Sequence, residues 1–171
     1  MIYLYERNKT GICVNRVFGY DRIVEIPDTL NGFPVTELGA YLFSDHIDAS
    51  ELNKKKETGS YCTENGIEEI PTDDMPQAAG NQVEEIRLPR FLRKIGRYAF
   101  YNCFKLRRLK FCGEMKDLGA GALTGCHKME QITVETDENG QSALRDFLTE
   151  LPETLRVDCL LYTSDAADDK A

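Results

Sequence analysis

Ile95-Gly-Arg-Tyr-Ala-Phe-Tyr-Asn-Cys103 and Leu118-Gly-Ala-Gly-Ala-Leu-Thr-Gly-Cys126 are two copies of one pattern, 23 residues apart. Each copy leads into the same run of apolar positions, Leu106/Leu109/Phe111 after the first and Met129/Ile132/Val134 after the second. Val83–Leu106 can be laid over Leu106–Met129 without a gap. A gapless repeat of this length is typical of a solenoid, in which successive coils of chain stack on one another.

The apolar run occurs three times, since Val83/Ile86/Leu88 precedes the other two copies. We interpret each run as a strand, in which side chains point alternately to opposite faces. If the last two apolar residues of each run point into the core, the residue between them and the one before point outward. Stacked in parallel, the outward residues form two short columns on one sheet face. These candidate binding residues are Glu85, Arg87, Arg108, Lys110, Gln131 and Thr133.

The motif Ile95-Gly-x-x-Ala-Phe-x-x-Cys103 followed by Leu106-x-x-Leu109-x-Phe111 resembles the BspA-like class of bacterial leucine-rich repeats. Ile26-Pro27 to Phe43, with Gly32-x-Pro-Val-Thr-x-Leu38, looks like the usual first repeat of that class. The resemblance covers roughly residues 24–43 and 83–134. The chain departs from the family in having Leu123 in place of Phe, a long acidic insertion and few repeats. The resemblance implies a curved binding scaffold, often part of a larger protein, with no catalytic motif.

We therefore predict an α/β leucine-rich-repeat solenoid: a short curved parallel sheet with short helical turns, an N-terminal hairpin cap and a C-terminal helix. The hairpin is expected within residues 1–19, and the helix over Ser142–Leu151, where apolar residues recur at helical spacing. One domain spans residues 1–158. Its parts are an N-terminal cap (1–22), a divergent first repeat (23–44), an acidic insertion (45–82), regular repeats (83–134) and a C-terminal cap (135–158).

The insertion holds nine acidic residues against three lysines and few large apolar residues. We expect it to loop out of the solenoid, with a helical part around Asp48–Lys56 and flexible chain elsewhere. Ile67 and Ile70 are its expected anchors to the core.

The last residues, Cys159-Leu-Leu-Tyr-Thr-Ser-Asp-Ala-Ala-Asp168, fit neither the repeat nor the capping helix. They are similar to the translation, in one reading frame, of a transposase adapter used to make sequencing libraries. We expect residues 159–171 to be an artefactual tail and the natural sequence to be known to about Asp158; the alternative is a genuine short acidic tail.

Residues 87–110 carry nine basic residues and no acid, within a chain whose formal net charge is −8. Three interpretations of this basic block stay open. It is a solvated solenoid face whose aromatic residues are core, or it is masked by the acidic insertion, or it binds nucleic acid or another polyanion. The next repeat adds only Lys116 and Lys128, whereas a phosphate-tracking groove normally extends further.

The sequence predicts no enzyme, metal site or cofactor. It holds no nucleophile elbow, P-loop, dinucleotide fingerprint or zinc-protease motif. The six cysteines include no C-x-x-C pair, so we expect reduced thiols, with Cys103 and Cys126 as small buried plugs at one repeat position. His127 is expected to be a surface residue. No apolar run is long enough for a membrane helix and the start lacks a signal peptide, so the chain is expected to be cytoplasmic.

We predict a non-catalytic scaffold that binds a protein partner through the six outward residues of the sheet. One alternative is that the chain is the targeting or recognition segment of a larger enzyme or toxin whose functional domain lies downstream. A further alternative is binding of nucleic acid or a polyanion through the basic block.

Overall fold

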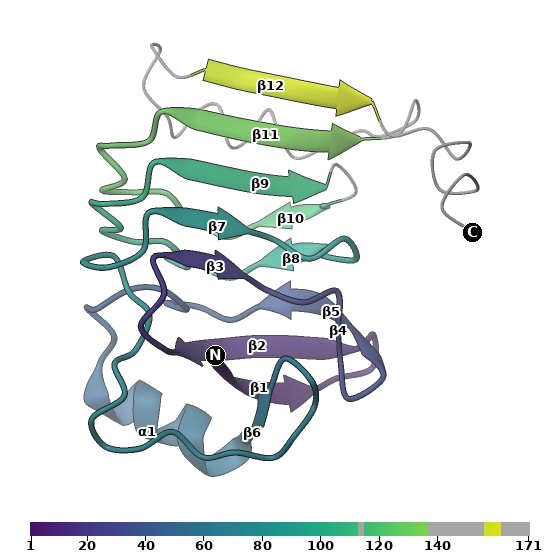
Figure 1. The fold of residues 1–171 in the computed structure, drawn as a ribbon, viewed down its shortest axis with the longest axis vertical. Coiled ribbons are helices and arrows are strands. Elements are labelled where there is room, and N and C mark those ends of the chain that lie inside the picture. The colour runs from purple at the N-terminus through teal and green to yellow at the C-terminus, as the bar shows by residue number, and fades with distance from the viewer. Residues whose placement is uncertain (113–114, 137–155, 162–171) are drawn as a thin grey trace.

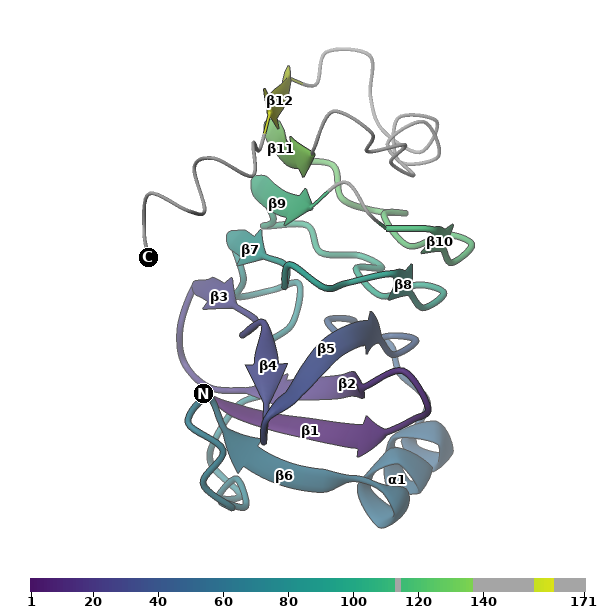
Figure 2. The ribbon, with the colours of Figure 1, turned by 90° about the vertical axis from the view of Figure 1, so that its right-hand side faces the viewer.

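The structure is a computed structural model of the chain and describes residues 1–112, 115–136 and 156–161. Successive coils stack along one axis, and two sheets run along the stack (Figures 1 and 2). The five-stranded sheet has the order β12-β11-β9-β7-β3 and is parallel throughout. Its strands are β3 (Ile23–Glu25), β7 (Glu85–Arg87), β9 (Arg108–Cys112), β11 (Gln131–Thr136) and β12 (Arg156–Leu161).

The second sheet has seven strands, six of them in the order β10-β8-β5-β2-β1-β6, with β4 attached to β5. Its strands are β1 (Ile2–Arg7), β2 (Ile12–Phe18), β4 (Thr29–Leu30), β5 (Phe33–Leu38), β6 (Ser60–Thr63), β8 (Lys94–Ile95) and β10 (Asp117–Leu118). Each repeat adds one strand to each sheet, as Figure 2 shows for β7 with β8 and β9 with β10. The chain therefore forms a β-solenoid.

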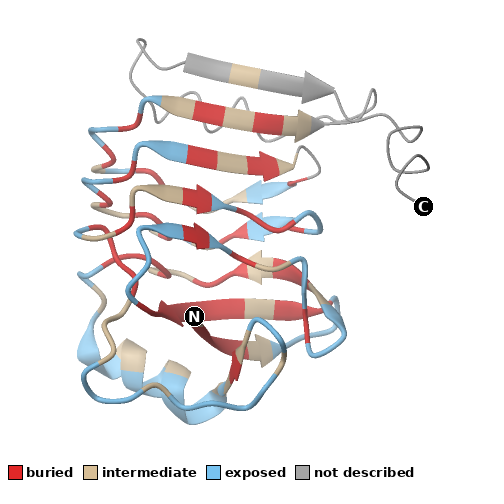
Figure 3. Cartoon of the chain, viewed as in Figure 1, coloured by how far each residue is buried: buried red, intermediate tan, exposed pale blue. Residues whose placement is uncertain are grey.

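The strand predictions for the repeats are confirmed. Glu85 pairs with Arg108 and Arg108 with Gln131, while Arg87, Lys110 and Thr133 form the next column. The apolar residues between them point inward and are buried, as the alternating colours along β9 and β11 show (Figure 3). One continuous core cluster runs from Tyr3 to Val134.

The turns of the repeats are not helices. Their backbone bonds span three residues, as from the Ala99 N–H to the Gly96 carbonyl, and do not continue into a helix. Among the described residues the only α-helix is α1 (Ala49–Thr58). The protein is therefore mostly sheet, and the predicted α/β class is only partly supported. The expected C-terminal helix over 142–151 lies outside the described residues.

Glycines at the turn entrances are explained by close packing between coils. A Cβ on Gly119 would lie 2.3 Å from the backbone nitrogen of Arg97, and one on Gly96 would lie 2.5 Å from that of Ala40. Only a residue without a side chain lets one coil approach the next so closely.

The N-terminal hairpin is present, since β1 and β2 pair antiparallel from Ile2/Phe18 to Arg7/Ile12. The first repeat then carries five more residues between its proline and glycine than the second does. The extra residues form the β4–β5 hairpin, whose loop residues Asn31 and Gly32 both have positive φ. Asn-Gly is the residue pair best suited to such a two-residue loop.

The insertion caps the N-terminal end of the stack (Figure 1). The helix predicted around Asp48–Lys56 is confirmed as α1, whose N-cap Asp48 accepts a hydrogen bond from the Ser50 N–H at 2.7 Å. The rest of the insertion was predicted to be flexible chain, but part of it forms a strand, since β6 pairs antiparallel with β1. The predicted anchors are wrong: Ile67 and Ile70 are 62% and 70% exposed.

Residues on and after β6 anchor the insertion instead. Cys62, Ala78 and Ala79 are buried, and the Tyr61 ring lies 6.1 Å from that of Phe18. The two isoleucines lie on the loop beyond β6, where no core surface meets them. A strand pairing, not apolar character alone, decides which part of the insertion is buried.

Arg16 joins the hairpin to the rest of the stack. Its guanidinium is buried and donates to Oε1 of Gln77 at 2.8 Å and to the backbone carbonyls of Leu42 and Tyr41. Burial lowers the pKa of Arg16 to about 10, so the group stays charged at neutral pH. One side chain thus links β2, the first repeat and the end of the insertion.

The C-terminal part of the described chain contains a strand that the sequence did not suggest. β12 pairs parallel with β11 from Gln131/Arg156 to Thr136/Leu161. Cys159 and the two residues after it therefore extend the repeat ladder, although they were expected to fit neither repeat nor cap. The remainder of the expected tail, residues 162–171, lies outside the described residues.

Candidate protein-binding face

The six predicted residues lie together on the outer face of the five-stranded sheet. β7, β9 and β11 present them in register, two from each strand. The Arg87, Arg108 and Lys110 side chains are 46%, 47% and 44% exposed, whereas that of Glu85 is 14% exposed. We call this set, together with Glu25 and Glu135 described below, the sheet face.

Glu85 organises the centre of the sheet face. One carboxylate oxygen accepts a hydrogen bond from Nε of Arg87 at 2.9 Å, and the other accepts one from Nε of Arg108, also at 2.9 Å. Burial opposes ionisation of Glu85, but the two guanidinium groups outweigh it and lower the pKa of the carboxyl. Glu85 is therefore a carboxylate at neutral pH and holds two arginines in fixed positions.

Neighbouring side chains continue this pairing. Lys110 Nζ lies 2.7 Å from a carboxylate oxygen of Glu135. Nη1 of Arg87 lies 3.6 Å from Glu25. The Gln131 amide donates to the Asp158 carboxylate. Arg87, Arg108 and Lys110 thus each have a carboxylate partner on the sheet face.

A further row of alternating charge runs beside the sheet face, just before the strands begin. Arg22 lies 3.6 Å from Glu84, and Arg107 lies 3.0 Å from Glu130. Glu84, Arg107 and Glu130 hold the same position in successive repeats. The 23-residue repeat therefore orders the charges along the stack as well as the apolar residues.

Sequence reasoning missed Glu25, Glu135 and Asp158 as members of this surface. Glu25 lies on β3, which pairs with β7 across the insertion. A signal was available: Val24-Glu-Ile-Pro27 matches Ile86-Arg-Leu-Pro89, which places Glu25 in the column of Arg87. Glu135 and Asp158 carried no such signal, because both lie beyond Val134, the last residue of the third apolar run.

The basic block does not form one surface. Arg87, Arg108 and Lys110 belong to the sheet face, but Lys94 lies on β8 of the other sheet. Arg97 lies over the Tyr41 ring, 5.8 Å from its centroid, at the turns. A continuous phosphate-tracking groove needs its cations on one side of the molecule, so this distribution disfavours polyanion binding.

The insertion does not provide the acids that pair with the basic residues of the sheet face. Arg87, Arg108 and Lys110 pair with Glu25, Glu85 and Glu135, which all lie outside residues 45–82. α1 and β6 lie at the opposite end of the stack from β9 and β11 (Figure 1). The masking interpretation is therefore not supported for these residues.

The cysteines serve packing. Cys103 and Cys126 are buried at equivalent turns, and their thiols donate to the backbone carbonyls of Phe43 and Phe100 of the preceding coil at 3.6 and 3.2 Å. The hydrogen bond with Cys126 and burial raise the pKa of Cys103, which keeps its thiol protonated. Over the described ranges, no three His, Cys, Asp or Glu side chains gather as a metal-binding group would.

Within the described chain, no helix combines the length and apolar character needed to cross a membrane. His127 is exposed on a turn, as expected.

Comparisons with known proteins bear on the repeats. The family described as "BspA type Leucine rich repeat region (6 copies)" matches residues 78–147. Comparison with curated proteins gives no match. Among solved structures, a leucine rich cell surface protein from Faecalibacterium prausnitzii aligns over 92% of this chain at 16% identity and a TM-score of 0.49. A leucine-rich-repeat protein of T. pallidum aligns over 93% of this chain at 17% identity and a TM-score of 0.32.

The chain spans 41% of the length of the F. prausnitzii protein and 80% of the T. pallidum protein. Leucine-rich repeats commonly mediate protein–protein interactions. The gapless 23-residue repeat, the in-register strands and the family match agree, and the chain therefore contains a BspA-type leucine-rich-repeat region over residues 78–147.

Proposed function

We propose that the sheet face is the docking surface for a protein partner and that the chain acts by binding alone. The observation that carries this proposal is the fixed array of partly exposed cations on β7 and β9, each paired with a carboxylate of β3, β7 or β11, with these strands in register. Groups held in place before binding lose less conformational freedom when a partner docks.

The arginines keep donors for a partner. A guanidinium has five N–H donors, and within the described residues Arg108 uses its Nε–H with Glu85. Within the part of the chain that the structure describes, the Nη groups of Arg108 make no hydrogen bond or ion pair, and we infer that they contact the partner. Arginine suits this role because its rigid fork binds carboxylates through two parallel hydrogen bonds.

The charge pattern favours a partner of mixed charge. The sheet face holds the carboxylates of Glu25, Glu85 and Glu135 next to Arg87, Arg108 and Lys110, so a uniformly acidic surface would meet three carboxylates as well as three cations. A complementary arrangement of both signs fixes the register of docking and rejects wrong partners. We therefore expect the partner to present a folded protein surface that carries both acids and bases.

The test is charge reversal of Arg108 and Lys110 together, followed by partner capture from cell lysate. The matched control reverses Lys105 and Lys128, which are exposed, equivalent in the repeat and located on turns outside the sheet face. We expect the R108E/K110E protein to lose the captured proteins and the K105E/K128E protein to keep them. Unchanged capture by a folded R108E/K110E protein would exclude the sheet face as the docking surface.

A further inference from the structure

The edge strand β3 leaves backbone groups open at the N-terminal end of the five-stranded sheet. In a parallel pair, alternate residues direct their N–H and C=O groups to opposite sides. The Arg22 carbonyl accepts from Glu84 and the Ile26 N–H donates to Arg87, so residues 22, 24 and 26 face β7. Ile23 and Glu25 therefore direct their peptide groups to the open side of β3.

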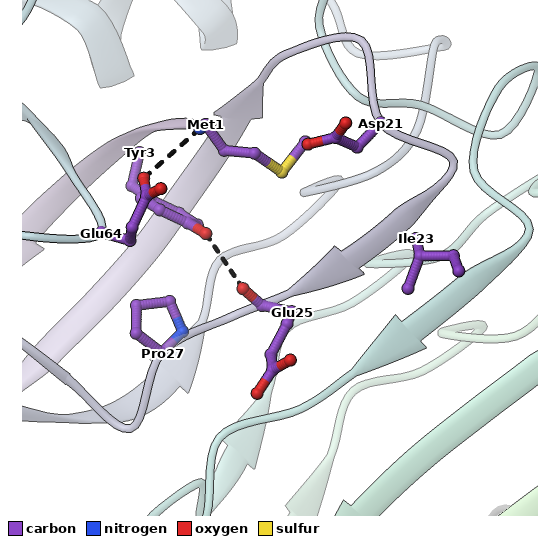
Figure 4. A pocket seen from close by; sticks show the side chains of 7 residues that line it. All are labelled: Met1, Tyr3, Asp21, Ile23, Glu25, Pro27 and Glu64. Carbon is purple, nitrogen blue, oxygen red and sulfur yellow. Dashed lines mark hydrogen bonds and ion pairs between the residues drawn. The ribbon is translucent and has the colours of Figure 1, made fainter.

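A pocket of about 370 Å³ lies along this open side. Figure 4 shows the side chains around it, which come from Met1 and β1, from β3 and the residues just before and after it, and from the loop after β6. Apolar lining is provided by the Ile23 side chain, which is 50% exposed, and by Pro27. The lining residues are Met1, Tyr3, Asp21, Ile23, Glu25, Pro27 and Glu64.

The pocket lining carries three carboxylates and one ammonium group, and it is net acidic although Nη1 of Arg87 lies 3.6 Å from the Glu25 carboxylate. Asp21, Glu25 and Glu64 supply the carboxylates, and the Met1 ammonium lies 3.3 Å from Glu64. Burial raises the pKa of the Tyr3 phenol above its usual value, and the charges of Glu64 and Glu25 raise it further. The phenol therefore stays protonated, and it donates to the Glu25 carbonyl at 3.0 Å.

The phenol of Tyr3 limits how a segment can bind. It already occupies the Glu25 carbonyl, so among the described residues the groups left for another chain are the N–H and C=O of Ile23 and the N–H of Glu25. Of these, the Ile23 C=O and the Glu25 N–H match the pair of hydrogen bonds that one residue of an added parallel strand makes with an edge. An added strand combines such main-chain bonds with pockets for alternate side chains.

We propose that the β3 edge binds an extended segment of a partner protein and that the acidic pocket takes a lysine or arginine side chain of that segment. The backbone bonds go to Ile23 and Glu25, and the cation lies among Asp21, Glu25 and Glu64. This site goes beyond the proposed docking at the sheet face, because Asp21 and Glu64 lie outside that face. The pocket volume is at the lower end of the range for small ligands and suits a single long side chain.

The experiment is an NMR titration of the ¹⁵N-labelled full chain with three blocked five-residue peptides at millimolar concentration. The first is Thr-Val-Lys-Val-Thr. The second replaces its lysine with glutamate, and the third keeps the lysine but carries N-methylated peptide bonds. We expect the lysine peptide to shift the amide signals of Ile23 and Glu25 in a saturable way. The other two peptides should bind at least about fivefold more weakly, since each lacks one of the two interactions.

The D21N/E64Q variant should weaken binding of the lysine peptide about tenfold, as two exposed ion pairs are lost. The matched control is E51Q/E57Q on α1, which removes the same charge away from the pocket and should bind like the unmodified chain. Absent binding, equal binding of the lysine and glutamate peptides, or shifts confined to other residues would overturn the proposal. Shifts of Ile23 and Glu25 that follow protein concentration alone would assign the edge to a second copy and also overturn it.

Discussion

Glu85 of β7 and Arg108 of β9 face each other as Cα partners one repeat apart and are joined by a hydrogen bond of 2.9 Å. The pair shows that equivalent positions of successive 23-residue repeats can carry opposite charges that lie side by side in the sheet. Arg107 and Glu130, also one repeat apart, form the same kind of pair. The repeat therefore orders the polar surface of the sheet while it builds the core.

Replacing Glu85 with Gln is expected to reduce the dependence of stability on pH. The folded-state pKa of Glu85 is lowered, so its contribution is present above the unfolded-state value of 4.5 and is lost as pH falls through the folded-state value. Thermal melting of both proteins between neutral pH and pH values below 4.5 provides the measurement. The gap between unmodified and E85Q proteins should narrow on acidification, and a constant gap would contradict the assigned pairing.

Phe100 tests the packing of equivalent turns. Its ring stacks on that of Phe43, with centroids 5.7 Å apart, while Leu123 fills the equivalent buried position of the next repeat. We expect Phe100→Ala to lower the free energy of unfolding by about 3–5 kcal/mol and Phe100→Leu by only about 1 kcal/mol. Urea denaturation followed by circular dichroism measures both. Equal losses would show that the position does not accept leucine as the repeat implies.

Gly119 tests the close approach of the coils. A Cβ there would lie 2.3 Å from the Arg97 backbone nitrogen, so Gly119→Ala should cost about 3 kcal/mol through backbone displacement. Gly32 is the control because a Cβ there meets nothing within 4 Å, and its φ of 78° alone should cost about 1 kcal/mol. The two variants are compared by urea denaturation. A larger loss for Gly32→Ala would argue against the packing explanation.

Arg16→Ala is expected to destabilise the protein by about 3–5 kcal/mol. The substitution leaves the buried Leu42 carbonyl without this donor and leaves the Tyr41 carbonyl with the Ser44 N–H alone, and it opens a cavity between the hairpin and the first repeat. Gln77→Ala removes one hydrogen bond of the same network and should cost about 1 kcal/mol. Thermal and urea denaturation measure both effects. Similar losses of stability for the two variants would show that the hydrogen bonds from Arg16 to the two carbonyls are not the main contribution of this side chain.

The regular repeats could be predicted from the sequence because a gapless period fixes which residues become neighbours. Leu109 and Ile132 are equivalent in sequence, and they are partners in the sheet. Arg108 and Gln131 are likewise partners in the sheet, because they hold the same position in successive 23-residue repeats.

The remaining parts depend on contacts between residues far apart in the chain. β3 pairs with β7 across the whole insertion, so Glu25 was not recognised as a neighbour of Arg87. β6 pairs with β1 over a similar separation, which buries Cys62 and leaves Ile67 exposed. Hydrophobicity cannot distinguish these two residues, because the strand pairing decides which one meets the core.

The measurement that tests docking at the sheet face most directly is site-specific photo-crosslinking. A photoreactive residue is placed at Thr133, which lies on the sheet face, or at Thr124, which is exposed on a turn of the same repeat. We predict that irradiation in lysate yields a discrete covalent adduct from position 133 and none from position 124. The same adduct from both positions, or an adduct from 124 alone, would contradict docking at the sheet face.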